Sequence, residues 1–334
     1  MHNITVIGAG TWGLALANLL YRNGHKITVW SALKDEIETL NKDYKHKNLP
    51  DLQLSKDIIF SNNLEESVKK SKILVFAVPS IYVRKTAKQL KDFYVSGQII
   101  VNVAKGIEEN TNMTLIEQIE EEIPKSKVAV LSGPSHAEEV AKNLPTTCVV
   151  GAKSFEIANF IQNIFMNSVF RVYTSPDVLG IELGGSLKNV IALAAGIADG
   201  LGYGDNTKAA LITRGIAEIS RLGLKMGGKY ESFYGLSGIG DLIVTCASMH
   251  SRNRRAGILI GKGYSMEEAM KEVNMVVEGV YSAKSAKSLA TKYKVEMPII
   301  NEVNAVLFEN KDPKTAVDSL MLREKIDENS NLMW

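Results

Sequence analysis

Hydrophobic positions in the first half of the chain fall into short runs rich in Val and Ile. Runs of this kind, bounded by polar residues, are typical of strands that are covered on both faces of a sheet. The pattern predicts strands at residues 3–8, 26–30, 73–78, 99–103, 128–132, 147–150 and 170–173.

Longer stretches with helical spacing of apolar residues separate several of these runs. They predict helices at residues 64–70, 82–90, 113–122 and 155–166. The polar segment 44–56 is expected to form a loop. Strands that alternate with helices indicate an α/β, Rossmann-like, doubly wound domain with a mainly parallel sheet.

After about residue 175 the pattern changes, and from residue 178 onward only helical spacing is found. The chain is therefore expected to divide into an α/β domain at residues 1–176 and an all-α C-terminal domain at residues 177–334. Helix start signals include Ser265, which is followed by two glutamates, and the pair Asp312-Pro313. Helices are predicted at residues 178–199, 208–222, 252–261, 266–273, 281–292, 300–308 and 314–320.

The first predicted strand runs directly into a glycine turn that opens an apolar helix. Gly8, Gly10 and Gly13 give the spacing GxGxxG. In this arrangement the first glycine permits a tight turn, the second lets a pyrophosphate approach the backbone, and the third lets the helix pack on the strand. Because the motif both follows a strand and opens a helix, it predicts a dinucleotide site; a purely structural turn is the alternative.

Composition and charge narrow the class of protein. The 334 residues are 45% hydrophobic and 23% charged, with a net charge of +2, which argues against a general attraction to nucleic acid or anionic lipid. No apolar run reaches the roughly 18 residues that a membrane helix needs. Cys148 and Cys246 have neither metal-site spacing nor a disulfide framework, which fits a reducing, cytoplasmic setting. No ligand cluster for a metal is found.

The choice between NAD and NADP stays open from the sequence. NAD-binding folds usually place a carboxylate about 20 residues after the glycines, at the end of the second strand. Here that strand ends at Trp30 and continues with Ser31, and Asp35 and Glu36 come slightly late, so they are assigned to the start of a helix. Without a repelling carboxylate at the strand end, NADP should be tolerated, with Lys34 and Ser31 available to its 2′-phosphate.

Two segments follow predicted strands at the edge where open α/β sheets bind ligands. Lys105 comes directly after the strand at 99–103 and could polarise a carbonyl group; a lysine at the surface is the alternative. The turn that contains Gly133 and Ser135 could hold an anion or the edge of a cofactor; a simple turn with Ser135 as helix N-cap is the alternative. His136 is assigned no catalytic role.

Lys188 lies in a helix whose other residues are almost all apolar or small, and such a helix is expected to be buried. Burial and a second cation nearby would lower the pKa of this lysine toward the range that is useful for proton transfer. Asp241, between glycines and an apolar run, is its candidate partner. The alternative is that the lysine side chain extends to the surface.

A phosphate site is predicted at Ser251, Arg252 and Asn253, which are expected to open a helix. A hydroxyl, a guanidinium, an amide and the free N–H groups of a helix start together suit a phosphate. The alternative is an exposed basic helix face, to which Arg254 and Arg255 are assigned.

Together these segments resemble the bacterial-type NAD(P)-dependent glycerol-3-phosphate dehydrogenases over essentially the whole chain. The segments that carry the resemblance are residues 8–13, 131–139, 185–206 and 250–253. The resemblance implies reversible hydride transfer between NAD(P)H and dihydroxyacetone phosphate. The product, sn-glycerol 3-phosphate, supplies the glycerophospholipid backbone. A homodimer is also implied.

The resemblance implies roles residue by residue. Lys188 would accept the proton in oxidation and donate it in reduction, with Lys105 and Asp241 as the other catalytic residues. Asn189 and Thr245 match positions near the substrate in the eukaryotic branch. The substrate would contact Lys105, Gly133, Ser135, Lys188, Asn189, Asp241, Thr245, Ser251, Arg252 and Asn253. Besides the glycine turn, the cofactor would contact Thr11, Trp12, Lys105, Ala137, Arg252, Val276 and Glu278.

The chain departs from the family pattern at two positions. Ser186 stands where Ala or Thr is usual, and Ala32 stands where many relatives carry a basic or imidazole side chain near the adenosine ribose. The second departure weakens any transfer of an NADP preference. Two other interpretations stay open: a sister dehydrogenase acting on another phosphorylated or carboxylated hydroxy compound, and a noncatalytic module that senses NAD(P)H.

Overall fold

The computed structural model describes residues 1–325, 327 and 328. Its first half contains a sheet of eight strands in the order β3-β2-β1-β4-β5-β6-β7-β8. Neighbouring strands are parallel except β6 and β7, which are antiparallel. The strands are β1 (Asn3–Ile7), β2 (Lys26–Trp30), β3 (Ile59–Ser61), β4 (Ile73–Phe76), β5 (Ile99–Asn102), β6 (Lys127–Ser132), β7 (Thr146–Ala152) and β8 (Phe170–Ser175).

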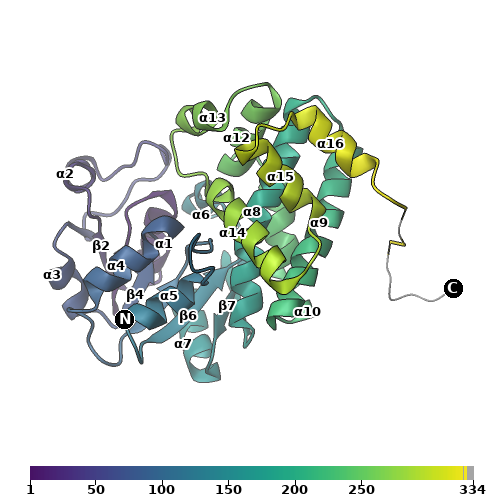
Figure 1. Cartoon of the computed structure of the whole chain (residues 1–334). Helices are drawn as coiled ribbons and strands as arrows, with labels where there is room; N and C mark the ends of the chain where they lie inside the picture. Colours follow the sequence, from purple (N-terminus) through teal and green to yellow (C-terminus); the bar gives the residue numbers. More distant parts are fainter. Residues whose placement is uncertain (326, 329–334) are drawn as a thin grey trace.

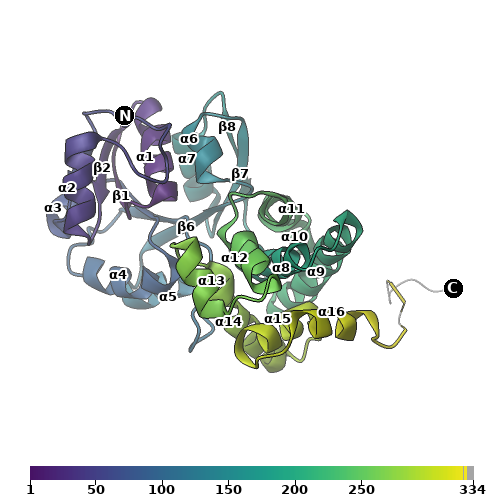
Figure 2. The same cartoon turned by 90° about the horizontal axis from the view of Figure 1, so that it is seen from above.

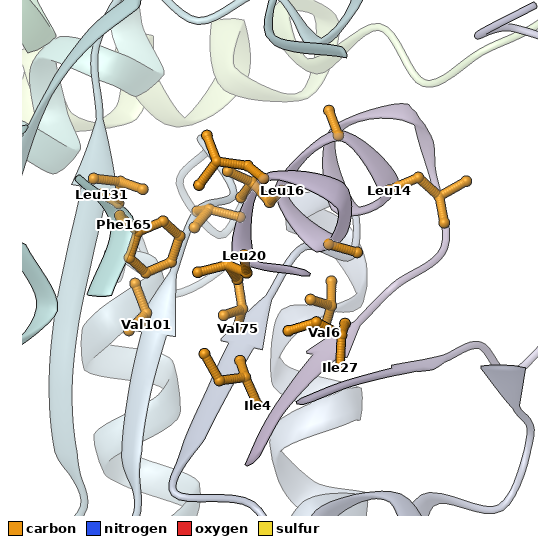
Figure 3. Close-up of a cluster of buried hydrophobic side chains, with 14 of the residues drawn as sticks. Ile4, Val6, Leu14, Leu16, Leu20, Ile27, Val75, Val101, Leu131 and Phe165 are labelled. Atoms are coloured by element: carbon orange, nitrogen blue, oxygen red, sulfur yellow. The ribbon is translucent and has the colours of Figure 1, made fainter. Parts of the chain in front are cut away.

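Helices cover both faces of this sheet because alternate strand residues point to opposite sides. Figure 3 shows one of the two cores, in which Leu16 and Leu20 of the first helix lie over Val75 and Phe165 packs near Val101. The opposite face is covered by a second cluster that includes residues of α3, α4 and α5. The helices of this half are α1 (Thr11–Arg22), α2 (Lys34–Asp43), α3 (Leu64–Lys69), α4 (Val83–Leu90), α5 (Leu115–Glu122), α6 (Ala137–Ala141) and α7 (Phe155–Phe165).

The second half is helical and lies beside the sheet half, as the green and yellow ribbons of Figures 1 and 2 show. Among the described residues, no strand follows β8. The helices are α8 (Val178–Gly200), α9 (Asp205–Met226), α10 (Tyr230–Phe233), α11 (Asp241–Ala247), α12 (Arg252–Gly261), α13 (Met266–Val273), α14 (Glu278–Tyr293), α15 (Pro298–Phe308) and α16 (Pro313–Met321).

Helix α8 is the centre of this half, and α9, α11, α12, α14 and α15 all contact it. By length and composition α8 could cross a membrane, but 89% of its most apolar window is buried inside the protein. The sequence analysis expects no apolar run to reach the length of a membrane helix, and α8 is a helix that does meet this length and composition. Its apolar surface is explained by burial, since a helix that is apolar all round needs neighbours on every side.

The predicted α/β and all-α halves are both present. All seven predicted strands form, within about two residues of the predicted ends, and the segment 44–56 is largely irregular. The short edge strand β3 and the helices α10 and α11 were not predicted. Between α10 and α11 the chain forms a π-helical turn at Leu236–Gly240, which delivers the chain to Asp241.

Candidate active site

The glycine turn has the geometry that a pyrophosphate site needs. Gly8 has φ +120°, and a Cβ there would lie 2.8 Å from the backbone of Ala77, while a Cβ on Gly13 would lie 2.1 Å from the oxygen of Gly8. Gly10, by contrast, faces open space, with nothing within 4 Å of a Cβ position. Helix α1 starts directly after it without a side-chain cap and without an acidic residue in its first turn. Its first N–H groups therefore suit an anion, and the residues present fit a bound dinucleotide.

Two lysines and one aspartate meet between the two halves of the molecule. Nζ of Lys105, from the loop after β5, lies 2.6 Å from Oδ2 of Asp241. Nζ of Lys188, from α8, lies 2.8 Å from Oδ1 of the same carboxylate and 2.6 Å from Oγ1 of Thr245. The Asp241 side chain is only 2% exposed and that of Lys188 7%. One buried carboxylate thus holds both ammonium groups.

Local structure explains why Lys105 reaches this carboxylate. The buried side chain of Asn102 accepts a hydrogen bond from the N–H of Ala104 and donates to its carbonyl, which shapes the turn after β5. Gly185 of α8 lies beside the Lys105 stem, where a Cβ would come within 3.6 Å of it. The Ser186 hydroxyl donates to the carbonyl of Gly106 at 3.0 Å and fixes α8 against the loop.

Burial dominates the electrostatics of Lys188. Desolvation is the main cause that lowers its pKa, the Asp241 carboxylate acts in the opposite direction, and the positive charge of Lys105 adds to the lowering; the resulting pKa is about 8. The alternative of a lysine that extends to the surface is excluded by its burial and its partners. A lysine with a pKa near 8 can exchange a proton at neutral pH, which suits general acid–base chemistry.

The turn after β6 adds polar groups next to Lys105. Nζ of Lys105 donates to the carbonyl of Gly133 at 3.0 Å, and the Ser135 hydroxyl donates to the same carbonyl at 3.0 Å. Gly133 has φ +140°, and a Cβ there would lie 3.0 Å from Cα of Cys148. The N-cap of α6 is His136 and not Ser135, so the alternative of Ser135 as a helix cap is wrong.

The predicted anion-binding segment does open a helix. The Ser251 hydroxyl caps α12 by accepting from the N–H of Arg254 at 3.2 Å. Arg252 is partly buried, and desolvation lowers its pKa; its guanidinium forms no hydrogen bond or ion pair to any described residue. A partly buried guanidinium with free donors is suited to bidentate binding of an anion. The assignment of Arg254 to an exposed basic face is wrong, because Arg254 pairs with Asp199 at 2.7 Å and is mostly buried.

Asn253 links three helices through its amide group. Its Oδ1 accepts from the backbone N–H of Gly279 at 2.8 Å, and its Nδ2 donates to Oδ1 of Asn189 at 2.9 Å. A backbone N–H can only donate, so the orientation of both amides is determined. Asn189 consequently keeps its own NH2 group for another acceptor.

The remaining predicted cofactor contacts lie around the same region. Glu278, at the start of α14, accepts a hydrogen bond from the N–H of Ser80 at 3.0 Å and another from the Ser80 hydroxyl. Burial raises the pKa of Glu278. Ala137 begins α6, which packs on α1, so it lies near the helix that Thr11 and Trp12 open. Val276 lies just before Glu278, half-buried.

Ser80 and His136 lie near the site and have no role assigned from the sequence, whereas Ser31 is expected there only as a group available to the 2′-phosphate of NADP. Ser80 connects the end of β4 to Glu278, and only its position after a strand could have indicated it. The His136 ring lies 5.8 Å from the His250 ring, and burial together with the charge of Lys188 lowers its pKa. The Ser31 hydroxyl donates to the Glu36 carboxylate at 2.6 Å. Asp35 and Glu36 do lie in the first turn of α2, as predicted, but the Glu36 carboxylate reaches back to Ser31, so the expectation that no carboxylate lies at the end of β2 is wrong.

Metal chemistry has no obvious location in this arrangement. Across residues 1–325, 327 and 328, no group of three or more His, Cys, Asp or Glu side chains is placed to hold a metal ion.

Comparisons with known proteins cover the whole length of the chain. The family profile described as NAD-dependent glycerol-3-phosphate dehydrogenase N-terminus matches residues 3–158, and the profile for the C-terminus matches residues 177–318. A protein of Agathobacter rectalis named glycerol-3-phosphate dehydrogenase [NAD(P)+] is 61% identical over 335 residues, covering 100% of both chains. One of Fusobacterium nucleatum with the same name is 63% identical over 328 residues, covering 97% of this chain and 98% of its own.

A solved structure agrees with these matches. The crystal structure of a glycerol-3-phosphate dehydrogenase from Coxiella burnetii superposes with a TM-score of 0.93 at 36% sequence identity. The match covers 96% of this chain and 99% of the Coxiella chain. Sequence and fold thus point to the same group of proteins.

Proposed function

The chain belongs to the NAD-dependent glycerol-3-phosphate dehydrogenase family, and from this premise we propose how its own residues carry out the reaction. It is an NAD(P)-dependent oxidoreductase that interconverts dihydroxyacetone phosphate and sn-glycerol 3-phosphate. The product supplies the backbone of glycerophospholipids. Family membership sets aside the interpretations as a sister dehydrogenase or a noncatalytic module.

The proposal depends on one observation, the Asp241 carboxylate that bridges Nζ of Lys105 and Nζ of Lys188. In the reducing direction the carbonyl oxygen of the substrate gains negative charge as hydride arrives. Two ammonium groups at one point stabilise that charge, and they act strongly because the site is largely closed to water. Lys188 then delivers the proton, and it accepts the proton in the oxidising direction.

The substrate phosphate is assigned to the start of α12. Arg252 supplies free guanidinium donors from a partly buried position, and the first N–H groups of the helix add a favourable field. Helix α12 packs against α8, which carries Lys188, and this contact supports the assignment of both ends of the substrate to one site. Ser251, Gly133 and Ser135 complete the substrate site. Fixing the phosphate orients the carbonyl, and such positioning can contribute several kcal/mol to catalysis.

The Asn189 amide is assigned to the reacting end of the substrate. The bond from Asn253 leaves the Asn189 NH2 group free as a donor, so it suits a carbonyl or hydroxyl oxygen. Asn253 also accepts from the N–H of Gly279, next to Glu278. Asn253 therefore connects Asn189, which is assigned to the substrate, with the segment that carries Glu278, which is assigned to the cofactor.

The cofactor is assigned to the glycine turn and the groups around it. When bound, NAD(P)H supplies the hydride. Gly10 leaves room for the pyrophosphate, and Gly8 and Gly13 hold α1 close to the sheet. The other assigned contacts are Thr11, Trp12, Lys105, Ala137, Arg252, Val276 and Glu278.

Several whole-protein features are part of the proposal. The division into a dinucleotide-binding domain at 1–176 and a substrate domain at 177–334 is supported by β8 ending at Ser175 and α8 starting at Val178. Residues 326 and 329–334 lie outside the described residues. A cytoplasmic location is supported by two buried free cysteines. A homodimer without a membrane span is proposed from the family and from the burial of α8.

The direct test is an absorbance assay at the nicotinamide band with dihydroxyacetone phosphate, run in parallel with NADH and NADPH. Oxidation of either cofactor should require the substrate, and unphosphorylated dihydroxyacetone should be used far less efficiently. Equal use of the unphosphorylated ketone would contradict the assigned phosphate site.

A further inference from the structure

The turn after β2 holds a carboxylate in a fixed place. The Ser31 hydroxyl donates to Oε2 of Glu36 at 2.6 Å and accepts from the N–H of Leu33 at 3.2 Å. Ser31 is 5% exposed, so its single hydroxyl proton is committed to Glu36 in a largely buried position. Glu36 lies in the first turn of α2, and its side chain reaches back to Ser31, the residue that follows β2.

This place adjoins the glycine turn. Strands β1 and β2 are paired so that Ile7 lies opposite Trp30, and the N–H of Gly8 donates to the Trp30 carbonyl at 2.8 Å. Ser31 is therefore next to the turn assigned to the pyrophosphate. In doubly wound folds the adenosine ribose lies at the end of this second strand, and an acidic residue there accepts from the ribose 2′-hydroxyl.

We infer that Glu36, positioned by Ser31, makes this enzyme select NAD(H) over NADP(H). The inference rests on the proposed cofactor site. A 2′-hydroxyl can donate a hydrogen bond to the carboxylate. A 2′-phosphate carries between one and two negative charges near neutral pH, so it is repelled by the carboxylate, and its dianionic form has no proton to donate.

The surroundings supply little to offset that repulsion. The sequence has no arginine between Arg22 and Arg84, and Ala32, beside Ser31, offers no polar side chain. His46, in the following loop, interacts electrostatically with Glu36, but burial outweighs this and lowers the pKa of His46, which disfavours its cationic form. Lys34 and Lys47 are exposed, and solvent and salt screen their charges. A firm 2′-phosphate site would need a fork of donors that these residues do not form.

The test compares NADH and NADPH on the full-length enzyme. Dissociation constants are measured without substrate by cofactor fluorescence, and kcat/KM is measured with saturating dihydroxyacetone phosphate. We expect the wild type to favour NADH by roughly tenfold or more in both measurements. Glu36→Gln keeps an acceptor for Ser31 but removes the charge. The dissociation constant of NADPH should therefore fall and its kcat/KM should rise, so that the preference for NADH over NADPH becomes severalfold smaller.

The matched control is Asp35→Asn, which removes a neighbouring exposed charge that has no bond to Ser31. This variant should leave the preference for NADH over NADPH nearly unchanged. Because salt screens charge repulsion, a higher ionic strength should reduce the preference for NADH over NADPH in the wild type and much less in Glu36→Gln. A glutamate that served only as a structural helix cap would not give this response.

Two results would overturn the inference. One is a wild type that binds and uses NADPH as well as NADH. The other is an Asp35→Asn variant that changes this preference as much as Glu36→Gln does. If NADH binds in preference but neither cofactor reduces dihydroxyacetone phosphate, the substrate assignment fails while the cofactor inference stands.

Discussion

The ammonium group of Lys188 is buried, and two hydrogen-bond acceptors stabilise its positive charge. Its Nζ lies 2.8 Å from Oδ1 of Asp241 and 2.6 Å from Oγ1 of Thr245. Thr245 in turn donates to the backbone carbonyl of Asp241 at 2.5 Å, which holds the hydroxyl lone pairs toward the lysine. The ammonium is thus stabilised by a nearby charge and destabilised by desolvation, and desolvation prevails.

This balance predicts opposite pH dependences for the two directions of the reaction. Lys188 has a pKa of about 8, so it is protonated below that pH and can donate, and it is neutral above that pH and can accept. Carbonyl reduction should therefore fall as pH rises through about 8, and alcohol oxidation should rise over the same range. Steady-state kcat/KM profiles in both directions check this. Lys188→Ala should lower turnover by about 10²–10⁴-fold and remove the inflection.

Asp241→Asn is the informative companion variant. The carboxylate raises the pKa of Lys188, so its removal should move both inflections to lower pH. Inflections that stay in place would show that the kinetic group is not Lys188.

Arg252 should contribute mainly to binding of the phosphorylated end of the substrate. Hydrogen bonds to a charged group are worth about 1.5–3 kcal/mol, so Arg252→Ala should raise KM for dihydroxyacetone phosphate by about 10–150-fold. Turnover at saturation should change much less. Unphosphorylated dihydroxyacetone makes no such bond and serves as the control substrate, with kcat/KM nearly unchanged. A loss that is equal for both ketones would place Arg252 elsewhere in the mechanism.

For single residues, the sequence can predict a functional role where a side chain is unusual for its neighbours in the chain. It cannot predict a contact that forms only when separate segments come together in the fold. A lysine in an apolar helix signals burial, and Lys188 is buried. Glu36 gives no such signal, because a glutamate in the first turn of a helix is ordinary. Only the three-dimensional path of residues 31–36 brings it back to Ser31. Ser80 is comparable, since its partner Glu278 lies 198 positions away.

Among the helices, the contact of α8 with α12 determines how the two ends of the substrate site face each other. Glycines allow this contact. A Cβ on Gly196 would lie 2.1 Å from the Arg254 oxygen, and one on Gly257 would lie 2.3 Å from the Leu193 oxygen. Gly200 and Gly261 repeat the arrangement one turn further on. The obstructing atoms are backbone, so they cannot give way as a flexible side chain would.

Gly257→Ala should therefore destabilise the protein, although the same change in an exposed helix interior normally stabilises it by about 1 kcal/mol. We expect a loss of about 1–3 kcal/mol from overpacking, measured by urea unfolding. The KM for dihydroxyacetone phosphate should also rise, because α12 carries Arg252 and α8 carries Lys188.

The control for this variant is Gly204→Ala, because Gly204 has nothing within 4 Å of a Cβ position. Gly204 is the N-cap of α9, where Ala is a poorer cap than Gly, so this change should cost about 0.5–1 kcal/mol, less than the loss expected at Gly257. If both variants were equally well tolerated, the close α8–α12 contact would be refuted.

Elements with strong periodicity could be predicted from the sequence, whereas those that depend on their neighbours could not. Strand β3 has only three residues, and it exists because its backbone pairs with β2. The reversed direction of β7 relative to β6 depends on the turn and on α6, since a Val-rich run has no direction of its own. The helix α11 begins inside a glycine-rich stretch whose helical form is decided by packing against α8.

Across the whole molecule, buried carboxyl groups tie helices together at two distant places. Glu182 of α8 accepts from the N–H of Ile116 in α5 and so joins the helical half to the sheet half. Glu218 of α9 accepts from the N–H groups of Ile299 and Ile300 at the start of α15. Burial raises the pKa of each carboxyl to about 7 and outweighs the hydrogen bonds that favour the ionised form.

Because the folded-state pKa values exceed the ordinary value of 4.5, stability should depend on pH in a definite direction. Between about pH 4.5 and pH 7 the folded protein holds more protons than the unfolded chain, so the free energy of unfolding falls as pH rises. Each carboxyl accounts for a change on the order of 3 kcal/mol. Urea unfolding at pH 5 and pH 8 checks this. The free energy of unfolding of the wild type minus that of Glu218→Gln should be smaller at pH 8 than at pH 5, and the same should hold for Glu182→Gln. The control is Glu267→Gln at an exposed position, for which this difference should be the same at both pH values. If the difference were also the same at both pH values for Glu182→Gln and Glu218→Gln, the two buried carboxyl groups would ionise normally in the folded protein.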